Sequence, residues 1–379
     1  MYKEADAVVI GAGVAGSSMA YALAKKGWNV VLLDKEKYPR HKACGEFLSP
    51  ESQFALQKFG LEHILRSLEP AIITKVRIHT EGGYSLEIPL PGQAWGLSRY
   101  ALDSRLQSSA IEMGASLYTS CTVNNITANG EGYRVESCRS SDNFSFNTRA
   151  VIGAGGRRTL NGLREPKPSP NNRTFVGIKS HYTREDRSPV VDLYFFQGGY
   201  IGISPVEGGR LNIAALLLNS AFQSLGGSSV IERILEQACR NSPILKQRLA
   251  GVAPIPGTQA ATFPVTVRRV PSAWNEIPCI GDAIAVIPPF CGDGMSMALR
   301  SVELCVPLAD CYLRGQCARE EWKTEYTRLI KRHFSSALRW GNLLERVLSH
   351  SVLSSWLLRL GSFAPGTAQR LVRATRLKN

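Results

Sequence analysis

The sequence has no run long enough for a membrane span and no paired-cysteine motif, and we expect no leader. No apolar run approaches the roughly 18 residues that a membrane-crossing helix needs. The nine cysteines are scattered without a CxxC pair, which argues against a disulfide framework and a zinc site and favours a reducing compartment. The first predicted strand begins near residue 5 and leaves no room for a secretion signal. We therefore expect a cytoplasmic protein, and 379 residues with 44% hydrophobic and 20% charged residues indicate about two domains.

Acidic residues are scarce at the C-terminal end. From Arg319 onward there are twelve Lys or Arg and four acids, which accounts for +8 of the formal net charge of +14. The last basic residues are Arg370, Arg373, Arg376 and Lys378. A solvated face is the simpler interpretation, and peripheral contact with a membrane surface or an acidic partner is the alternative. Nucleic acid is not an expected partner, because the sequence has no aromatic platform or recognised motif for it.

The segment from Ala5 to Asp34 reads as strand, glycine-rich turn, helix and strand. The turn places Gly11, Gly13 and Gly16 at the dinucleotide-binding spacing. Gly11 allows the tight turn, Gly13 lets the backbone approach a pyrophosphate, and Gly16 lets the helix pack close to the strand. Asp34 stands 23 residues after Gly11, where an acid can accept hydrogen bonds from a ribose. This order of elements predicts a Rossmann-type unit with phosphates at the helix N-terminus.

A basic loop follows that unit and ends in Cys44–Gly45–Glu46. Arg40 is placed to donate hydrogen bonds to the cofactor's phosphates or ribose, and a solvated basic loop is the alternative. The glycine triplet, acid, Pro-Arg, Lys and Cys-Gly-Glu run resembles the start of the geranylgeranyl reductase branch of FAD-dependent oxidoreductases. That branch is related to the flavin monooxygenases that resemble p-hydroxybenzoate hydroxylase. The resemblance implies that Cys44 and Gly45 lie beside the isoalloxazine ring as active-site candidates. A cysteine filling a small buried gap is the alternative.

Further segments match the same family. Arg99 precedes a predicted helix, and the resemblance implies that it reaches the flavin's ribityl chain or phosphates. A strand ends at Gly281, and Asp282 at its tip can accept a hydrogen bond from a ribityl hydroxyl. A second helix then opens with amides that face the pyrimidine end of the flavin. The cofactor-binding candidates are Gly11, Gly13, Ala15, Gly16, Asp34, Lys35, Arg40, Arg99, Gly281, Asp282, Gly292, Gly294 and Met295.

Two departures from the family bear on the chemistry. Gly155 stands where the family carries an Asp that helps hold the flavin and the nicotinamide donor. FAD is therefore expected, with NAD(P)H as the electron donor or a separate reductase as a partner that supplies electrons. The lipid-binding motif of the prenyl reductases is also degraded, with Ile203 in place of Trp and Ser204–Val206 in place of Phe-Pro-Lys.

The predicted fold class is α/β. It comprises a Rossmann-type, glutathione-reductase-like FAD-binding domain, an inserted antiparallel β-sheet substrate domain and a helical C-terminus. The FAD-binding domain is expected over 1–80, 94–165 and 276–325. The substrate domain is expected over 81–93 and 166–275, and a linker over 164–173. The helical C-terminal region is expected over 326–379. Helices are expected over 54–68 and 228–249, and strands over 175–181, 190–196, 200–204 and 211–218. The expected buried helix faces include Leu102, Leu106, Ala110 and Ile111, and later Leu343, Leu344, Val347 and Leu348.

The leading functional hypothesis is an FAD-dependent monooxygenase that acts on an apolar small molecule, whether aromatic, polyketide or isoprenoid-like. The alternative is a flavin-dependent alkene reductase of the geranylgeranyl reductase type, and oxygen dependence of product formation would separate the two. A halogenase is less favoured, because Ala273 and Asn275 replace the tryptophan pair that halogenases carry ahead of Ile277–Pro278. A non-catalytic FAD-binding protein is the remaining alternative.

Overall fold

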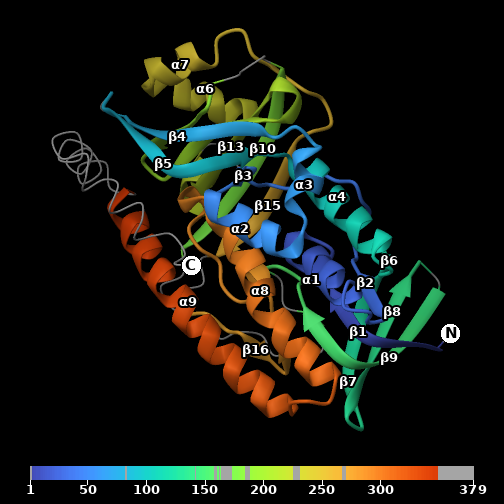
Figure 1. The fold of residues 1–379 in the computed structure, drawn as a ribbon. Helices are drawn as coiled ribbons and strands as arrows, with labels where there is room; N and C mark the ends of the chain where they lie inside the picture. Colours follow the sequence, from blue (N-terminus) through green and yellow to red (C-terminus); the bar gives the residue numbers. More distant parts are fainter. Residues whose placement is uncertain are drawn as a thin grey trace.

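The computed structural model describes residues 2–81, 83–140, 142–157, 160–161, 163, 173–183, 188–224, 231–266 and 270–348. These residues form two large β-sheets and a small two-stranded one, with helices packed on both large sheets and one long helix along the side (Figure 1). Nearly all of the predicted linker and the whole basic tail lie outside the described residues.

The first sheet is a Rossmann-type sheet with an antiparallel extension. Its six strands run in the order β6 (Ser116–Tyr118), β2 (Val30–Leu33), β1 (Tyr2–Ile10), β9 (Asp142–Gly153), β8 (Gly132–Arg139) and β7 (Thr122–Asn129). The pairs that join β6, β2, β1 and β9 are parallel, and β9, β8 and β7 form an antiparallel meander. Because β1 is buried on both faces, its apolar run belongs to two different hydrophobic clusters.

The second sheet is larger and mostly antiparallel. Its main path is β14 (Ala253–Pro254), β10 (Thr174–Thr183), β13 (Arg210–Leu218), β12 (Gly199–Val206), β11 (Val190–Phe196), β4 (Ala71–Thr80), β5 (Ser85–Gly96) and β3 (Phe47–Leu48), and β15 (Ala260–Thr266) pairs with β10. The β11–β4 pair is parallel, which the expectation of an antiparallel sheet did not include. The strand β4 thus belongs to this sheet, although its residues fall within the predicted FAD-binding bounds; the domain division itself stays a prediction.

Helices cover both sheets. The Rossmann side carries α1 (Val14–Ala24), α2 (Pro50–Phe59), α3 (Glu62–Arg66), α4 (Arg99–Glu112), α8 (Gly294–Leu313) and α9 (Arg319–Leu348), and the second sheet carries α5 (Asn219–Ser224), α6 (Ile231–Asn241) and α7 (Pro243–Arg248). The short elements are η1 (Glu207–Gly209), β16 (Trp274–Asn275), β17 (Ile277–Pro278), η2 (Gly281–Ala283) and η3 (Pro289–Cys291). In the described part of the chain, no helix is long and apolar enough to cross a membrane.

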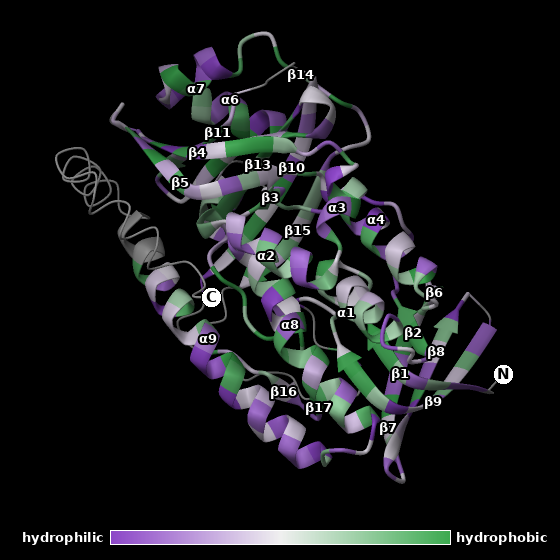
Figure 2. Ribbon diagram, in the orientation of Figure 1, coloured by the Kyte–Doolittle hydropathy of each residue, from purple (hydrophilic) through white to green (hydrophobic). Residues whose placement is uncertain are grey.

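Helix α9 lies along α8 and shows hydrophilic and hydrophobic segments in alternation (Figure 2). Its apolar residues recur at four-residue spacing and are buried, namely Trp322, Tyr326, Ile330, Phe334 and Leu338. The Tyr326 hydroxyl donates a hydrogen bond of 2.8 Å to the Cys279 carbonyl, which ties α9 to the chain just before η2. The helix therefore holds the segment that approaches the glycine-rich turn.

The four strands expected in the second sheet are confirmed. The strand expected to end at Gly281 is instead the short β17, which ends at Pro278 before η2, and several helical details are also corrected. Gly60 and Ser242 each interrupt a predicted helix, so that 54–68 and 228–249 each contain two helices rather than one. Ile111 is 50% exposed and Leu343 is 49% exposed, so neither belongs to the buried face predicted for it. The side chains of the other three residues in the second set lie outside the described residues. All nine cysteines fall within the described residues and are free thiols.

Candidate functional site

The glycine-rich turn is shaped by two close contacts and one open face. A Cβ on Gly11 would lie 2.2 Å from the Ala154 carbonyl oxygen, and one on Gly16 would lie 1.7 Å from the Gly11 oxygen. Both positions therefore require glycine, because the backbones pack where a side chain would stand. A Cβ on Gly13 would meet only the tips of Arg99 and Lys42, each at 3.6 Å. Gly13 thus presents its backbone to open space beside two cations.

A buried carboxylate holds those two cations in place. Asp103 on α4 is fully buried and accepts hydrogen bonds from Arg99 Nε at 2.8 Å and from Lys42 Nζ at 2.6 Å. Burial by itself would raise the pKa of Asp103, but the charges of Arg99 and Lys42 outweigh it and lower that pKa. Burial also lowers the pKa of Lys42, against the opposing effect of Asp103. The result is a fixed positive pair that faces the glycine turn.

Asp34 closes the loop that follows the second strand. Its carboxylate accepts hydrogen bonds from the backbone amides of Ala12 at 2.7 Å and Glu36 at 2.9 Å, and from the Tyr38 hydroxyl at 3.1 Å. Asp34 therefore fixes the glycine turn through the Ala12 amide. Its predicted hydrogen bond to a ribose stays a prediction. Arg40 lies over the Tyr38 ring at 5.6 Å, and its buried Nε has no hydrogen-bond partner among the described residues. Lys35, next to Asp34, is exposed.

The glycine motif that begins at Gly281 packs against the glycine-rich turn at Gly11–Gly16. A Cβ on Gly281 would lie 3.0 Å from the Ala15 Cβ, which places η2 on the first turn of α1. Gly281 and Gly292 both have positive φ, of 65° and 72°, and Gly281 donates its amide to Ser301 Oγ at 2.9 Å. Gly294 opens α8, and a Cβ there would meet nothing within 4 Å. Asp282 is half-buried and Met295 is buried at the start of α8. Two motifs that lie far apart in the sequence thus meet in the fold.

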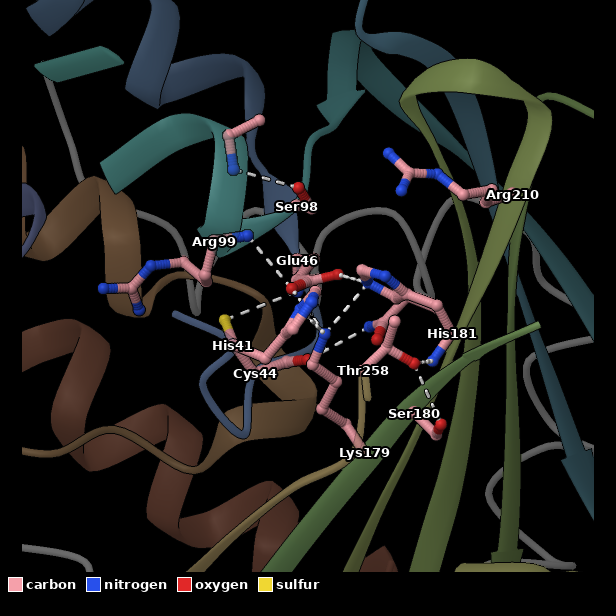
Figure 3. Close-up of polar contacts among 12 residues, drawn as sticks. His41, Cys44, Glu46, Ser98, Arg99, Lys179, Ser180, His181, Arg210 and Thr258 are labelled. Carbon is pink, nitrogen blue, oxygen red and sulfur yellow. Dashed lines mark hydrogen bonds and ion pairs between the residues drawn. The ribbon is translucent and has the colours of Figure 1, made fainter. Parts of the chain in front are cut away.

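The Cys44–Gly45–Glu46 turn lies above a buried polar cluster (Figure 3). Glu46 has a positive φ of 55° and a fully buried side chain. Its carboxylate contacts His181 Nε2 at 2.6 Å and Lys179 Nζ at 3.1 Å, and it accepts the Arg99 backbone amide at 3.0 Å. One carboxylate therefore joins the turn to the strand β10 and to the start of α4.

His41 and the turn itself complete this cluster. Lys179 Nζ lies 3.2 Å from His41 Nδ1 and 2.9 Å from His181 Nε2. The Glu46 amide donates to Cys44 Sγ at 3.4 Å, and the Asn212 side-chain amide donates to the Cys44 carbonyl at 3.0 Å. The turn is therefore fixed from both sides by hydrogen bonds.

Burial and charge set the protonation of the cluster. Burial alone would raise the pKa of Glu46, but the hydrogen bond from His181 and the charge of Lys179 lower it. Burial lowers the pKa of Lys179, against the opposing charge of Glu46. Burial, Lys179 and His181 together lower the pKa of His41 to about 4. Glu46 is therefore ionised and His41 neutral at pH 7.

An aromatic wall stands beside the same turn. Phe195 lies 5.4 Å from Tyr200 and 5.9 Å from Phe290, ring centroid to ring centroid. Phe47 belongs to this cluster, and a Cβ on Gly292 would lie 2.8 Å from its ring. Burial raises the pKa of Tyr200, and the Cys291 and Cys44 thiols raise it further. Tyr200 is half-buried against these apolar rings.

The sequence interpretation did not single out the polar cluster. Lys179 and His181 are two residues apart on a strand, so both point to the same face of the sheet. Two basic residues on the buried face of a strand were the available signal. Their partner Glu46 is 133 and 135 residues away in the sequence, which no local pattern records. Lys42 and its partner Asp103 were missed for the same reason.

Comparison with known proteins gives one family model and several relatives. Residues 6–50 match the model described as FAD dependent oxidoreductase. The chain is 27% identical to a menaquinone reductase of Mycolicibacterium smegmatis, over 81% of this chain and 77% of that protein. It is 25% identical to the flavin-dependent halogenase armH3 of Armillaria mellea, over 86% and 72%. It is 27% identical to a digeranylgeranylglycerophospholipid reductase 2 of Methanopyrus kandleri, over 78% and 74%.

Solved structures share the fold. A geranylgeranyl bacteriochlorophyll reductase-like protein from Thermoplasma acidophilum superposes with a TM-score of 0.75 at 19% identity, covering 92% of this chain and 88% of that one. The myxobacterial chondrochloren halogenase CndH superposes with a TM-score of 0.76 at 20% identity, covering 90% and 81%. The fold of this chain is therefore shared with both of these proteins.

Proposed function

We propose that this chain, which belongs to the FAD-dependent flavoprotein superfamily, binds FAD at Gly13 and reduces a carbon–carbon double bond of an apolar, isoprenoid-like substrate. That it is an FAD-dependent oxidoreductase follows from its family match and its relatives. The finer activity is the proposal. It is carried by one observation: the Cys44–Gly45 turn, with Gly45 exposed, leads directly to Phe47 of the aromatic wall.

The residues present fit FAD. Gly13, Gly45 and Gly294 all lack a close neighbour on the side where a Cβ would point, so a ligand is able to touch the backbone at all three. Arg99 and Lys42 would bind the pyrophosphate beside Gly13, and the buried Nε of Arg40 offers another donor there. The opening amides of α8 at Gly294 would face the pyrimidine edge of the flavin and stabilise negative charge on it.

The apolar wall favours a hydrocarbon substrate. Phe47, Phe195, Tyr200 and Phe290 form one cluster with aliphatic side chains of β4, β5 and β11. The polar group of this cluster, among the described residues, is the Tyr200 hydroxyl. Burial raises the pKa of this hydroxyl and keeps it protonated. Two of the reductases that this chain resembles over most of its length act, by their names, on menaquinone and on a digeranylgeranyl lipid. An isoprenoid chain is the substrate class that these features support.

The chemistry divides between cofactor and protein. When bound, reduced FAD would supply the hydride for one carbon of the double bond. The Cys44 thiol, half-buried at the turn, donates a proton to the other carbon and becomes a thiolate. The aromatic wall holds the substrate and keeps water from the reacting carbons.

Electrons must enter from a donor. We propose NAD(P)H or a separate reductase in this role, since the family's nicotinamide-handling Asp is replaced by Gly155. Reduction of the holoenzyme by NADH or NADPH under nitrogen distinguishes the two, because a separate reductase leaves the flavin oxidised in both.

Monooxygenation and halogenation are the alternatives, and they differ from reduction in their oxygen requirement. The experiment mixes chemically reduced holoenzyme with menaquinone under nitrogen and analyses the lipid by mass spectrometry. Reduction predicts a gain of two hydrogens in the isoprenoid side chain, which persists after the quinone ring is reoxidised in air, and loss of that product in Cys44→Ser. Product that forms only after air is admitted, with a gain of one oxygen, would contradict the proposal in favour of monooxygenation. The same reaction with added chloride or bromide tests for a halogenated product.

A further inference from the structure

We propose that Ser85, His79 and Asp192 form a second site, a serine–histidine–aspartate arrangement that cleaves an accessible carboxylic ester. The three residues come from neighbouring strands of the second sheet, namely β5, β4 and β11 (Figure 2). None of them belongs to the residues assigned above to FAD or to the apolar substrate. The test of this site is therefore independent of the proposed function.

The contact between serine and histidine is direct. Ser85 lies opposite His79 in the antiparallel pair of β5 and β4. Its Oγ is 2.7 Å from His79 Nδ1, which is the distance of a good hydrogen bond. Ser85 is exposed, whereas His79 is only 4% exposed. A hydroxyl that is open to solvent thus contacts the ring nitrogen of a buried histidine.

Asp192 sets the direction of that hydrogen bond. Its Oδ1 lies 3.3 Å from His79 Nε2, and its side chain is buried. Burial by itself would raise the pKa of Asp192, but the hydrogen bonds from His79 and Arg248 outweigh it and lower that pKa. An ionised carboxylate only accepts hydrogen bonds, so the neutral imidazole carries its proton on Nε2. Nδ1 therefore presents its lone pair to the Ser85 hydroxyl, as a general base must.

Further contacts hold the histidine and the aspartate in these positions. Tyr194 stacks on the His79 ring at 4.4 Å between centroids, with the two ring planes 8° apart. Arg248 Nε at the end of α7 donates to Asp192 Oδ2 at 3.0 Å, and Arg77 Nη1 donates to Oδ1 at 3.4 Å. The plane of the imidazole and the direction of the carboxylate are therefore fixed before an ester binds, as a triad requires.

The Ser85 backbone amide supplies a donor for the negative charge that develops on the ester oxygen. The Thr80 amide donates to the Tyr84 carbonyl at 3.0 Å, so His79 and Ser85 form a non-hydrogen-bonded pair of the ladder. The Ser85 amide therefore points away from β4. On that side of β5, among the described residues, β3 pairs only with the far end of the strand. The amide thus lies at an open edge, on the same residue as the nucleophile.

The geometry allows a balanced acyl transfer. Ser85 Oγ forms a bond to the carbonyl carbon of the ester while its proton passes to His79 Nδ1. The bond from that carbon to the alkoxy oxygen then breaks, and the leaving alcohol takes the proton from His79. Water attacks the acyl-serine in the same way, which releases the carboxylic acid and restores the Ser85 hydroxyl.

The first test measures the reactivity of Ser85. The full-length holoenzyme is treated with a fluorophosphonate, which modifies activated serines, and the modified residues are followed by mass spectrometry. Ser116, exposed on β6, is the internal reference, because its hydroxyl has no histidine partner among the described residues. Ser85 is expected to react roughly a hundredfold faster than Ser116, which is the lower range of what a general base contributes. Equal rates at the two serines would overturn the proposal.

The second test measures cleavage of an ester. Hydrolysis of p-nitrophenyl acetate is followed in wild-type holoenzyme, Ser85→Ala and Ser116→Ala, and acetylation of Ser85 is followed by mass spectrometry. Both substitutions change exposed side chains, so the fold is retained. We expect a transient acetyl group on Ser85, a rate at least about tenfold lower in Ser85→Ala, and the wild-type rate in Ser116→Ala. A wild-type rate in Ser85→Ala, or hydrolysis without acetylation of Ser85, would overturn the second site.

Discussion

Single residues decide whether a dinucleotide is able to approach the turn. Gly13 has φ −83° and ψ −168°, a region open to any residue, and its missing Cβ points at the tips of Arg99 and Lys42. Gly16 differs, because a Cβ there would overlap the Gly11 oxygen. The two glycines therefore serve different purposes, one for the ligand and one for the fold.

We expect Gly13→Ala to fold normally and to bind FAD more weakly by roughly tenfold or more, which corresponds to about 1.4 kcal/mol. The added methyl occupies the space where the pyrophosphate would touch the backbone. Quenching of flavin fluorescence on titration measures the affinity, and thermal unfolding of the apoprotein serves as the control for folding. Gly16→Ala is the matched variant and is expected to lose folded protein. Unchanged FAD affinity in Gly13→Ala would contradict this placement of the cofactor.

Asp103 offers a second test at this scale. Asp103→Asn removes the charge that holds Arg99 and Lys42, and loss of one partner from a buried ion pair costs about 3–5 kcal/mol. Glu112→Gln on the same helix removes an ion pair with Arg105 whose acid is 52% exposed, and it is expected to cost at most about 1 kcal/mol. Urea unfolding of both variants measures the difference. Equal, small losses would show that Asp103 does not hold the cations.

His41 predicts a pH dependence of stability. Its pKa is about 4 in the folded protein against 6.5 in an ordinary histidine, so the unfolded chain binds the extra proton between those values. Stability is therefore expected to fall as the pH drops from about 6.5 towards 4. Urea unfolding across this range measures the slope, and His41→Gln is expected to flatten it. Equal slopes in both proteins would rule out a buried neutral His41.

At the scale of elements, the long helix α9 shows what periodicity predicts and where it stops. The helix was predicted from its pattern, and its first buried residues follow four-residue spacing. A true α-helix repeats every 3.6 residues, so such a stripe drifts around the axis and leaves the core. Leu343 lies five residues past Leu338, about 140° around the helix axis, and is exposed. Gly341 faces the core instead, where a Cβ would lie 3.2 Å from Ile287 and 3.3 Å from Pro288.

Phe334 and Trp340 test the packing of α9. Phe334 is 1% exposed and Trp340 is 38% exposed. Phe334→Ala is expected to lower the free energy of unfolding by about 3–5 kcal/mol through the cavity it leaves. Trp340→Ala is expected to change it by under about 1 kcal/mol. Chemical denaturation of the two variants measures both values, and a large loss in Trp340→Ala alone would mean that the helix is rotated.

Strands of the second sheet were predicted within a few residues, because alternating apolar residues and paired glycines mark their ends. The pairing partners of these strands were not predicted. The parallel pairing of β4 with β11 joins residues more than a hundred positions apart, and nothing in either strand specifies it. Sequence patterns report which face is buried, whereas pairing depends on the whole chain.

At the scale of the whole molecule, the site is made where the two sheets meet. The glycine turn follows β1 of the first sheet, while Lys179 and His181 lie on β10 of the second. The sequence predicted the nucleotide end, because its glycines form a local motif. The buried cluster was not predictable, since a carboxylate and its two basic partners carry no signal until folding brings them together.

The central claim is that the early turn and the late α8 motif hold a single FAD. The most direct measurement is a titration of purified protein with FAD, followed by the visible spectrum and the fluorescence of the flavin. Saturation at one FAD per chain is predicted, with the flavin fluorescence quenched and the affinity weakened in Gly13→Ala. A protein that stays colourless after addition of FAD, and leaves the flavin fluorescence unchanged, would contradict the account.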